Sequence, residues 1–271
     1  MSPPDLDFLC ALVRARSGLV IRGERSFFVE TRLAPLARRE RMESVSELVA
    51  RVREKPADPL ARATVEAMMI QETSFYRDRA AFGALESHVL PAIGPGKPTR
   101  RVWSAGCGKG QEAYSLAMLA LEGDPGLPPV EILATDISTA VLEKAQTGVY
   151  SHFEVQRGLP IRRLLAHFEE VDESWRVKPE VRRRVRWMRL NLMDDFRVQE
   201  GYDLILCRNV VSAFAPDARD SVLRRLSDAL APGGRLMLGA GEQPLEGFVG
   251  IPAAPCVFGR QDEVGIAEAA A

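Results

Sequence analysis

From Arg101 to the end of the chain, short β-rich runs alternate with amphipathic helical segments, and this alternation constrains the fold most. The β-rich runs are RVWSAGC, VEILATD, VRWMRLNL, YDLILCRN and GRLMLGAG. Between them lie segments with helical character, such as QEAYSLAMLALE, STAVLEKAQ and DARDSVLRRLSDAL. Strands that alternate with helices form wound α/β sheets, so the sequence predicts an α/β fold in this region.

The first 70 residues have a different pattern. Apolar residues repeat at helical spacing from Leu6 to Val13, and the sequence from Ser44 to Glu47 has the form of a capping box. The turn-rich segment GPGKPT precedes the first expected strand. We therefore expect a helical N-terminal domain over 1–75, a linker and cofactor-covering segment over 76–100, and a sheet domain over 101–271.

Composition excludes several classes of protein. The 271 residues include 36 basic and 37 acidic side chains, so the net charge of -1 provides no general attraction to nucleic acid. The N-terminus has no basic start before its apolar segment, and the apolar runs are short, so we expect a cytoplasmic chain without membrane insertion. Four well-separated cysteines without a CxxC pair predict neither a metal site nor disulfides.

Three alternate glycines, Gly106, Gly108 and Gly110, follow the first expected strand. In an open α/β sheet the ligand lies beyond the carboxyl ends of the strands, where this loop is expected. A dinucleotide site requires GxGxxG, whereas this loop is GxGxG and continues into Gln111 and Glu112. Polar acceptors at a helix start suit an amino group or a cation better than a pyrophosphate. The alternative is a glycine turn that only reverses the chain.

Polar residues also follow the other expected strands. Asp136 ends the second strand, where a carboxylate commonly accepts hydrogen bonds from both ribose hydroxyls. The alternative role for Asp136 is to cap the next helix, although Ser138 can do this itself. Asn191 follows the third strand, where its amide could contact an adenine edge, and Arg208 and Asn209 follow the fourth. Together with the glycine loop, these residues indicate an S-adenosylmethionine pocket.

The motifs ETSFYRD, RVWSAGCGKGQEAYSLAM, ATDIS, VLEKAQTGVYS, LNL and LILCRNVV occur in an order and at spacings that resemble the CheR family of chemotaxis receptor methyltransferases. The resemblance implies an all-α N-terminal domain and a Rossmann-like class I methyltransferase domain. It also implies a small antiparallel β-subdomain inserted at about 168–190. Members of the family transfer a methyl group from S-adenosylmethionine to glutamates of chemoreceptor cytoplasmic helices, giving glutamyl methyl esters and S-adenosylhomocysteine.

The resemblance also assigns roles to individual residues. Arg77 would lie near the carboxylate of the cofactor, and Gln111 would accept a hydrogen bond from its amino group. Arg208 and Asn209 would line the methyl-transfer site, so the residues expected to take part in catalysis are Arg77, Arg208 and Asn209. The residues expected to bind the cofactor are Gln71, Thr73, Arg77, Ala105, Gly106, Gln111, Asp136, Asn191, Leu192, Arg208 and Asn209. No metal is expected.

The chain departs from the family pattern at several positions. Ser212 and Ala213 stand where the family has a branched aliphatic residue and a tyrosine. Lys109 would place a positive charge beside a cationic ligand, and Gln111 replaces an acidic acceptor. Imperfect positioning can cost on the order of 100-fold in rate, so we expect normal cofactor binding with slow transfer. The alternatives are a regulatory protein that binds the cofactor, or a methyltransferase for nucleic acid or a small molecule.

Two basic segments are candidates for partner binding. Four arginines between residues 31 and 41 could dock an acidic receptor helix: Arg32, Arg38, Arg39 and Arg41. The alternative is a solvated helix face on which Glu43 or Glu47 pairs with nearby arginines. The second segment, VRRRVRW at 181–187, is expected in the inserted subdomain as a solvated β-face. We expect a monomer that does not bind nucleic acid.

Overall fold

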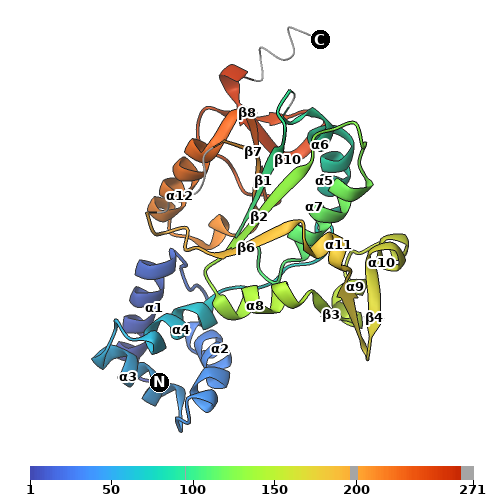
Figure 1. Cartoon of the computed structure of the whole chain (residues 1–271). Helices are drawn as coiled ribbons and strands as arrows, with labels where there is room; N and C mark the ends of the chain where they lie inside the picture. Colours follow the sequence, from blue (N-terminus) through green and yellow to red (C-terminus); the bar gives the residue numbers. More distant parts are fainter. Residues whose placement is uncertain (95, 196–200, 264–271) are drawn as a thin grey trace. The chain divides into compact units, whose positions relative to one another are not determined.

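The computed structural model describes residues 1–94, 96–195 and 201–263, and contacts divide them into two units (Figure 1). The N-terminal unit contains residues 1–70 together with 212–219. The sheet unit contains the other described residues. The three-part division expected from the sequence, at 1–75, 76–100 and 101–271, remains a prediction. Each unit is described here by itself.

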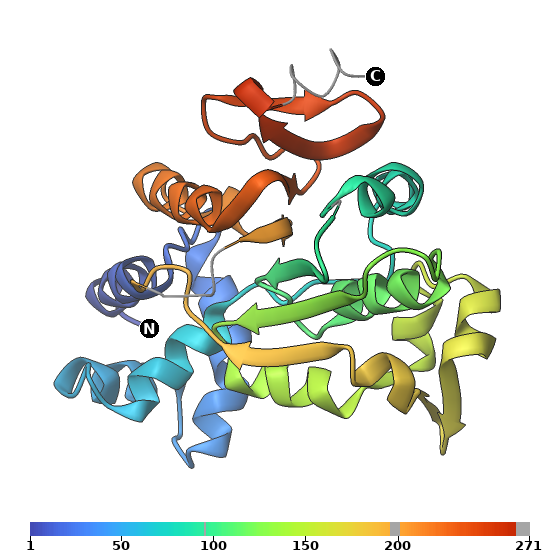
Figure 2. The same cartoon turned by 45° about the horizontal axis from the view of Figure 1, so that its top comes forward.

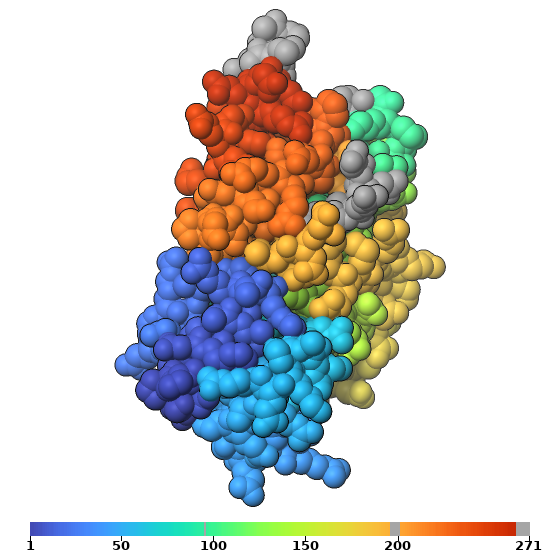
Figure 3. Space-filling view, turned by 90° about the vertical axis from the view of Figure 1, so that its left-hand side faces the viewer, coloured from blue at the N-terminus to red at the C-terminus, as the bar shows by residue number. Residues whose placement is uncertain are grey.

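The N-terminal unit contains four main helices. They are α1 (Pro3–Ser17), α2 (Arg25–Arg39), α3 (Val45–Glu54) and α4 (Pro59–Met68). Ser44 begins α3 by accepting a hydrogen bond from the Glu47 N–H at 3.1 Å, and Asp58 begins α4 by accepting one from the Leu60 N–H at 3.1 Å. Their buried apolar stripes, which include Leu9, Leu33 and Leu48, form one core. These residues make up a compact body, dark blue to cyan in Figure 3.

A short segment from far along the sequence completes the N-terminal unit. Residues 212–219 include most of the 3₁₀ turn Val211–Ala213 and the first turn of α12 (Pro216–Ala229). Leu19 forms an antiparallel bridge with Phe214. The Val20 N–H donates to the Ala213 carbonyl at 2.9 Å, and the Ala215 N–H donates to the Gly18 carbonyl at 2.9 Å. The sequence pattern did not predict this association.

The sheet unit is built on a seven-stranded sheet of order β6-β2-β1-β7-β8-β10-β9. The strands are β1 (Arg100–Ala105), β2 (Val130–Asp136), β6 (Val185–Arg189), β7 (Tyr202–Cys207), β8 (Leu230–Leu238), β9 (Phe248–Ile251) and β10 (Ala254–Arg260). Strands β6, β2, β1, β7 and β8 are parallel, whereas β10 is antiparallel to β8 and β9. The predicted α/β fold is confirmed.

Helices precede and connect these strands. They include α5 (Arg79–Ala84), α6 (Leu90–Ala92) with a π-helical turn at Leu85–Val89, α7 (Gln111–Glu122) and α8 (Thr139–Thr147). The register pairs Ala105 with Thr135, and Asp136 with Arg189. Because β1, β2 and β6 are parallel and in register, their carboxyl ends lie at one edge of the sheet (Figure 2).

A small antiparallel sheet of order β3-β5-β4 lies in the connection between α8 and β6. It contains β3 (Val149–Ser151), β4 (Phe168–Val171) and β5 (Ser174–Val177), with α9 (His152–Gln156) and α10 (Ile161–His167) between β3 and β4.

The range of about 168–190 expected for the insertion differs from this sheet at both ends. The expected range begins after β3, which belongs to the small sheet. The range also includes β6 at its end, and β6 pairs with β2 in the main sheet. Within the basic segment 181–187, the first residues belong to α11 (Pro179–Arg182) and the last belong to β6. Val185 is buried and Trp187 packs on Tyr114 at 5.3 Å, so these apolar side chains bind β6 to the core despite the arginines between them.

Gly110 provides a test of the packing around the glycine loop. It precedes α7 with φ +86°, and a Cβ there would lie 2.6 Å from Cη2 of Trp187. Gly247 has φ +89°, and a Cβ there would meet no atom within 4 Å, so it is a matched control. Both Gly→Ala changes should lose about 1–2 kcal/mol through backbone strain. Gly110→Ala should lose a further ~1–3 kcal/mol through overpacking, measured by urea denaturation. Equal losses would contradict this packing.

Candidate functional site

The glycine loop is tied to the neighbouring strand by its backbone. The N–H groups of Gly106 and Cys107 both donate to the carbonyl of Thr135, at 2.8 and 2.9 Å. Gly106 has φ +71°, and a Cβ there would lie 2.6 Å from Cγ2 of Val210. Glycine is therefore required directly after Ala105 ends β1, because the backbone turns there within contact distance of Val210, which follows β7.

The carboxylate of Asp136 joins the glycine loop to the start of α8. Its Oδ2 accepts from the Gly108 N–H at 3.0 Å, and its Oδ1 accepts from the Ser138 N–H at 3.0 Å. Ser138 is the N-cap residue of α8, but its own side chain makes no capping hydrogen bond. Asp136 therefore has the helix-start role considered as an alternative. Its place at the carboxyl end of β2 is also the position at which a ribose-binding carboxylate is expected, and that role remains a prediction.

A pocket of about 410 Å³ lies beside this loop. Its lining residues are Gln71, Glu72, Thr73, Lys109, Gln111, Ser151, Phe153, Glu154 and Arg157. Gln111 is only 2% exposed, and its Oε1 has no hydrogen-bond partner among the described residues. The Thr73 Oγ1 is likewise buried without a partner there. An unpaired buried polar atom costs about 1–3 kcal/mol, so both atoms are suited to a ligand.

Lys109 does not bring an uncompensated charge to this pocket. Its Nζ pairs with Oε1 of Glu154 at 3.2 Å. Burial raises the pKa of Glu154, but hydrogen bonds from the Ser151 backbone and Lys109 outweigh that effect, and the pKa is lowered overall. Glu154 therefore stays ionised and offsets the lysine. The repulsion of a cationic ligand that we expected from Lys109 is reduced by a residue distant in sequence.

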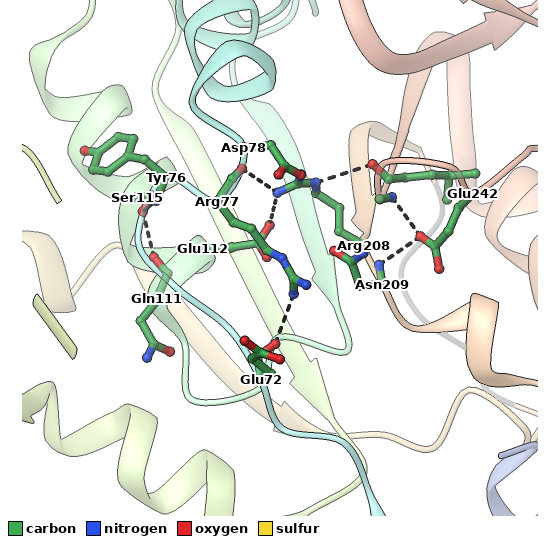
Figure 4. Close-up of polar contacts among 12 residues, drawn as sticks. Glu72, Tyr76, Arg77, Asp78, Gln111, Glu112, Ser115, Arg208, Asn209 and Glu242 are labelled. Carbon is green, nitrogen blue, oxygen red and sulfur yellow. Dashed lines mark hydrogen bonds and ion pairs between the residues drawn. The ribbon is translucent and has the colours of Figure 1, made fainter. Parts of the chain in front are cut away.

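Arg208 is the centre of a buried polar cluster (Figure 4). Its Nη1 donates to Oε2 of Glu112 at 2.8 Å and to the Arg77 carbonyl at 2.9 Å. Its Nη2 pairs with Oδ2 of Asp78, and its Nε donates to the Leu238 carbonyl at 3.3 Å. The guanidinium therefore joins the ends of β7 and β8, the start of α7 and the segment at 77–78, and four of its five N–H donors have protein acceptors.

Asn209 is held in an unusual backbone conformation by Glu242. Asn209 has φ +58°, and its N–H donates to Oε2 of Glu242 at 2.8 Å. The same oxygen accepts from the Gly239 N–H at 2.7 Å, and a Cβ on Gly239 would lie 2.6 Å from Nδ2 of Asn209. The Asn209 Oδ1 is buried without a hydrogen-bond partner in the described chain. The carboxylate thus fixes the backbone while one side-chain acceptor stays available.

The remaining expected residues have local contacts. The Arg77 Nη1 donates to the Glu72 carbonyl at 3.0 Å. The Asn191 Nδ2 donates to Oδ1 of Asp194 at 3.0 Å, and its Oδ1 accepts from the Met193 N–H at 3.1 Å, so this amide closes a turn after β6. Leu192 in the same turn is buried.

The structure therefore brings the expected residues together in four local groups. Gln71, Thr73 and Gln111 line one pocket. The other groups are the loop of Ala105 and Gly106 with Asp136, the cluster of Arg77, Arg208 and Asn209, and the turn with Asn191 and Leu192.

Several residues of this site were not predicted from the sequence. Glu112 is 7% exposed and burial raises its pKa, although Arg208 opposes the shift. An acidic residue inside the first turn of an apolar helix was a usable signal for Glu112. Glu242 follows the apolar run of β8, as Asp136 follows that of β2, and could have been found by the same rule. The pocket wall from 151 to 157 carried no signal, because only the folded chain brings it to Gln111.

Two classes of site are not seen in the part of the chain that the structure describes. Within those residues, no group of three histidine, cysteine, aspartate or glutamate side chains could hold a metal ion. Across the same residues, no helix has the length and apolar character needed to cross a membrane.

Comparison with protein families gives two adjoining matches. Residues 4–68 match the family described as "CheR methyltransferase, all-alpha domain". Residues 71–247, more than half of the chain, match "CheR methyltransferase, SAM binding domain". Both the helical region and the sheet region with its glycine loop are therefore covered by one family.

Curated relatives agree with this assignment. The chain is 37% identical to the chemotaxis protein methyltransferase of Vibrio parahaemolyticus, over 85% of this chain and 86% of the relative. It is 37% identical to chemotaxis protein methyltransferase 1 of Vibrio cholerae, over 86% of each chain. It is 34% identical to chemotaxis protein methyltransferase 1 of Pseudomonas aeruginosa, over 88% of this chain and 89% of the relative. The chain belongs to the CheR methyltransferase family and is an S-adenosylmethionine-dependent methyltransferase.

Proposed function

We propose that this enzyme methylates glutamate side chains on the cytoplasmic helices of chemoreceptors and forms glutamyl methyl esters. Its family and its relatives, which are chemotaxis protein methyltransferases, support this proposal. The single structural observation that carries it is the buried, unpaired Oε1 of Gln111 in the pocket beside the glycine loop. This acceptor matches the amino group of S-adenosylmethionine, so the residues present fit the cofactor that the family requires.

The other cofactor contacts follow from the same geometry. Asp136 lies at the end of β2, where a carboxylate suits the ribose hydroxyls, and the glycines after Ala105 let a ligand approach the backbone. Gln71 and Thr73 cover the pocket from the segment before α5. Asn191 and Leu192 would lie at the adenine, with Leu192 supplying apolar surface. When bound, the cofactor supplies a methyl group on a positively charged sulfur.

The reaction requires positioning more than acid–base chemistry. A glutamate side chain with a reference pKa near 4.3 is already ionised at neutral pH, so no general base is needed. A carboxylate oxygen must instead lie in line with the methyl group at about 3–3.5 Å. We assign direct contact at this site to Asn209, because its Oδ1 is buried without a partner in the described chain. Arg208 is assigned a positioning role, because its guanidinium already has four protein acceptors. Arg77 would meet the carboxylate of the cofactor.

A second candidate function is a regulatory protein that binds the cofactor but has weak catalysis. The observation that favours it is the pair Ser212 and Ala213, where the sequence departs from the family pattern. Neither residue replaces the bulk or the hydroxyl group of the expected tyrosine. The enzymatic function is preferred, because a missing tyrosine hydroxyl does not prevent methyl transfer to an ionised carboxylate.

We propose that the receptor helix docks on the arginines at the end of α2. Arg32 is turned to its own unit, since its Nη1 donates to the Met69 carbonyl at 3.1 Å and its guanidinium lies 5.3 Å from the Phe28 ring. Arg39 pairs with Glu40 at 3.1 Å on the surface, where such a pair contributes little stability. Arg38, Arg39 and Arg41 are therefore the best candidates for contact with an acidic helix.

Transfer of a radiolabelled methyl group tests the function directly. Receptor cytoplasmic fragments incubated with the enzyme and labelled S-adenosylmethionine should acquire label that base releases as methanol. Fragments whose methylation-site glutamates are changed to alanine should acquire none. Stable cofactor binding without any base-labile label would instead support the regulatory function.

Substitutions of Gln111 test the cofactor site. Gln111→Met should weaken binding of S-adenosylhomocysteine by about 1.5–3 kcal/mol, because a hydrogen bond to a charged amino group is lost. The same change should leave the ligand-free protein equally or more stable, because it removes an unpaired buried acceptor. Gln111→Glu should keep the affinity. Calorimetry and urea denaturation measure both effects, and the exposed Gln156 in a Gln156→Met variant is the control. Unchanged affinity in Gln111→Met would exclude this contact.

Charge reversal tests the docking surface. The double change Arg38→Glu with Arg41→Glu should greatly reduce receptor binding and methylation without altering cofactor affinity. Raising the salt concentration should have a similar effect, because exposed charges are screened beyond about 8–10 Å at ordinary ionic strength. Arg183→Glu with Arg186→Glu makes the same charge change at two exposed arginines of the sheet unit and is the matched control. Equal losses in both variants would indicate a nonspecific effect of net charge.

A further inference from the structure

The N-terminal unit contains an apolar pocket of about 310 Å³ that none of the proposed roles uses. Six apolar residues line it: Leu19, Val20, Ile21, Phe28, Ile70 and Ala213. Ile70 is 56% exposed, which is unusual for a large apolar side chain next to a pocket. The pocket and the exposed Ile70 beside it give this unit an apolar hollow that a ligand side chain could fill.

The pocket exists because Ala213 has a small side chain and its backbone is held in place by hydrogen bonds on both sides. The Ala213 carbonyl accepts from the Val20 N–H at 2.9 Å, and the Ala215 N–H donates to the Gly18 carbonyl at 2.9 Å. The Leu19–Phe214 bridge lies between these bonds. Because the backbone is held on both sides of Ala213, the segment cannot close over the space that its methyl group leaves.

The chain connects this pocket directly to the cofactor site. Ile70 immediately precedes Gln71, and Ala213 lies four residues after Asn209. Four residues span at most about 14 Å, whatever the arrangement of the two units. Two turns of an α-helix rise about 11 Å. A helix that presents a glutamate to Asn209 and runs toward Ala213 therefore has other side chains within reach of Ala213.

The rim of the pocket indicates the chemistry of the occupant. Arg22 lines the pocket, is exposed, and has no hydrogen-bond or ion-pair partner among the described residues. An apolar pocket with one available guanidinium at its rim matches a helix that carries an apolar side chain beside an acidic one. Such a helix is amphipathic and acidic, as expected for the proposed substrate.

We propose that this pocket receives an apolar side chain of the substrate helix, within two turns of the glutamate that is methylated, and thereby selects which glutamates are modified. The inference rests on the proposed function and adds a specificity determinant to it. Ala213 sets the size of the pocket, and Arg22 binds an acidic neighbour of the inserted side chain.

The experiment compares pairs of receptor fragments that differ only beside the methylated glutamate. One fragment keeps its apolar residues within seven positions of that glutamate, and the other has alanine there. The wild-type enzyme should show a kcat/KM about 10- to 100-fold higher for the first fragment, mainly through a lower KM, as expected for one apolar side chain in a pocket. Ala213→Leu should remove this preference by filling the pocket. The readout is the ratio of kcat/KM between the two fragments for each enzyme, because a larger residue at Ala213 can also change the rate of transfer to both fragments.

Phe27→Ala is the matched control, because Phe27 is 72% exposed beside Phe28 but does not line the pocket. This variant should keep the wild-type preference. Binding is measured separately by fluorescence anisotropy, with S-adenosylhomocysteine present and the target glutamates changed to glutamine. Suppose that the enzyme methylates neither fragment in the kinetic experiment and still shows a binding preference that Ala213→Leu removes. This result would support the pocket and overturn the proposed function.

Two results would overturn the pocket assignment while leaving the proposed function intact. One is equal methylation of both fragments by the wild-type enzyme. The other is a concentration-dependent dimer, seen by sedimentation of the wild type and abolished in Ala213→Leu, which would assign the pocket to a second copy of this chain.

Discussion

The site depends on the compensation of one buried charge, the guanidinium of Arg208. Removal of one partner from a buried ion pair typically costs about 3–5 kcal/mol, because the remaining charge is left without compensation. Here the partners come from three other parts of the sheet unit: Glu112 in α7, the Arg77–Asp78 segment, and the carbonyl that ends β8. The cluster therefore holds the segment that covers the pocket against the strand end that carries Asn209. Glu112 is buried, and this burial raises its pKa, while Arg208 opposes the shift.

Three of the expected site residues have a buried side-chain oxygen without a partner in the described chain: Thr73 Oγ1, Gln111 Oε1 and Asn209 Oδ1. Most buried polar atoms in native proteins are paired, so such exceptions require an explanation. The paired and the unpaired polar groups have complementary roles. Paired groups such as Arg208 and Glu242 hold the backbone in place, and the proposed function uses unpaired acceptors for contact with the ligand. A site of this kind is preorganised, because its positioning contacts exist before the ligand binds.

The departures from the family pattern have different physical consequences. Lys109 would weaken the binding of a cationic ligand, but Glu154 pairs with it and offsets the charge. Gln111 lacks the charge of the usual acidic residue but keeps a buried acceptor atom. Ser212 and Ala213 have no such compensation, and the space at Ala213 remains open as an apolar pocket. The proposed substrate pocket is therefore formed at the position where the family has a tyrosine.

Local features of the sequence determined the fold class, the helical character of the first 70 residues and the common edge at which Gly106, Asp136 and Asn191 lie. These features are apolar periodicity, glycine spacing and polar residues at strand ends, and each depends only on neighbouring residues. Only the tertiary structure decided which groups pair with Arg208, because Glu112 and Asp78 lie 96 and 130 positions away in the chain. The tertiary structure also placed 212–219 in the N-terminal unit, which the sequence did not predict. It placed β6 in the main sheet, as the alternation of strands and helices predicted, although the range expected for the insertion had included β6. Contacts between distant segments depend on how whole elements pack, and no local pattern encodes that packing.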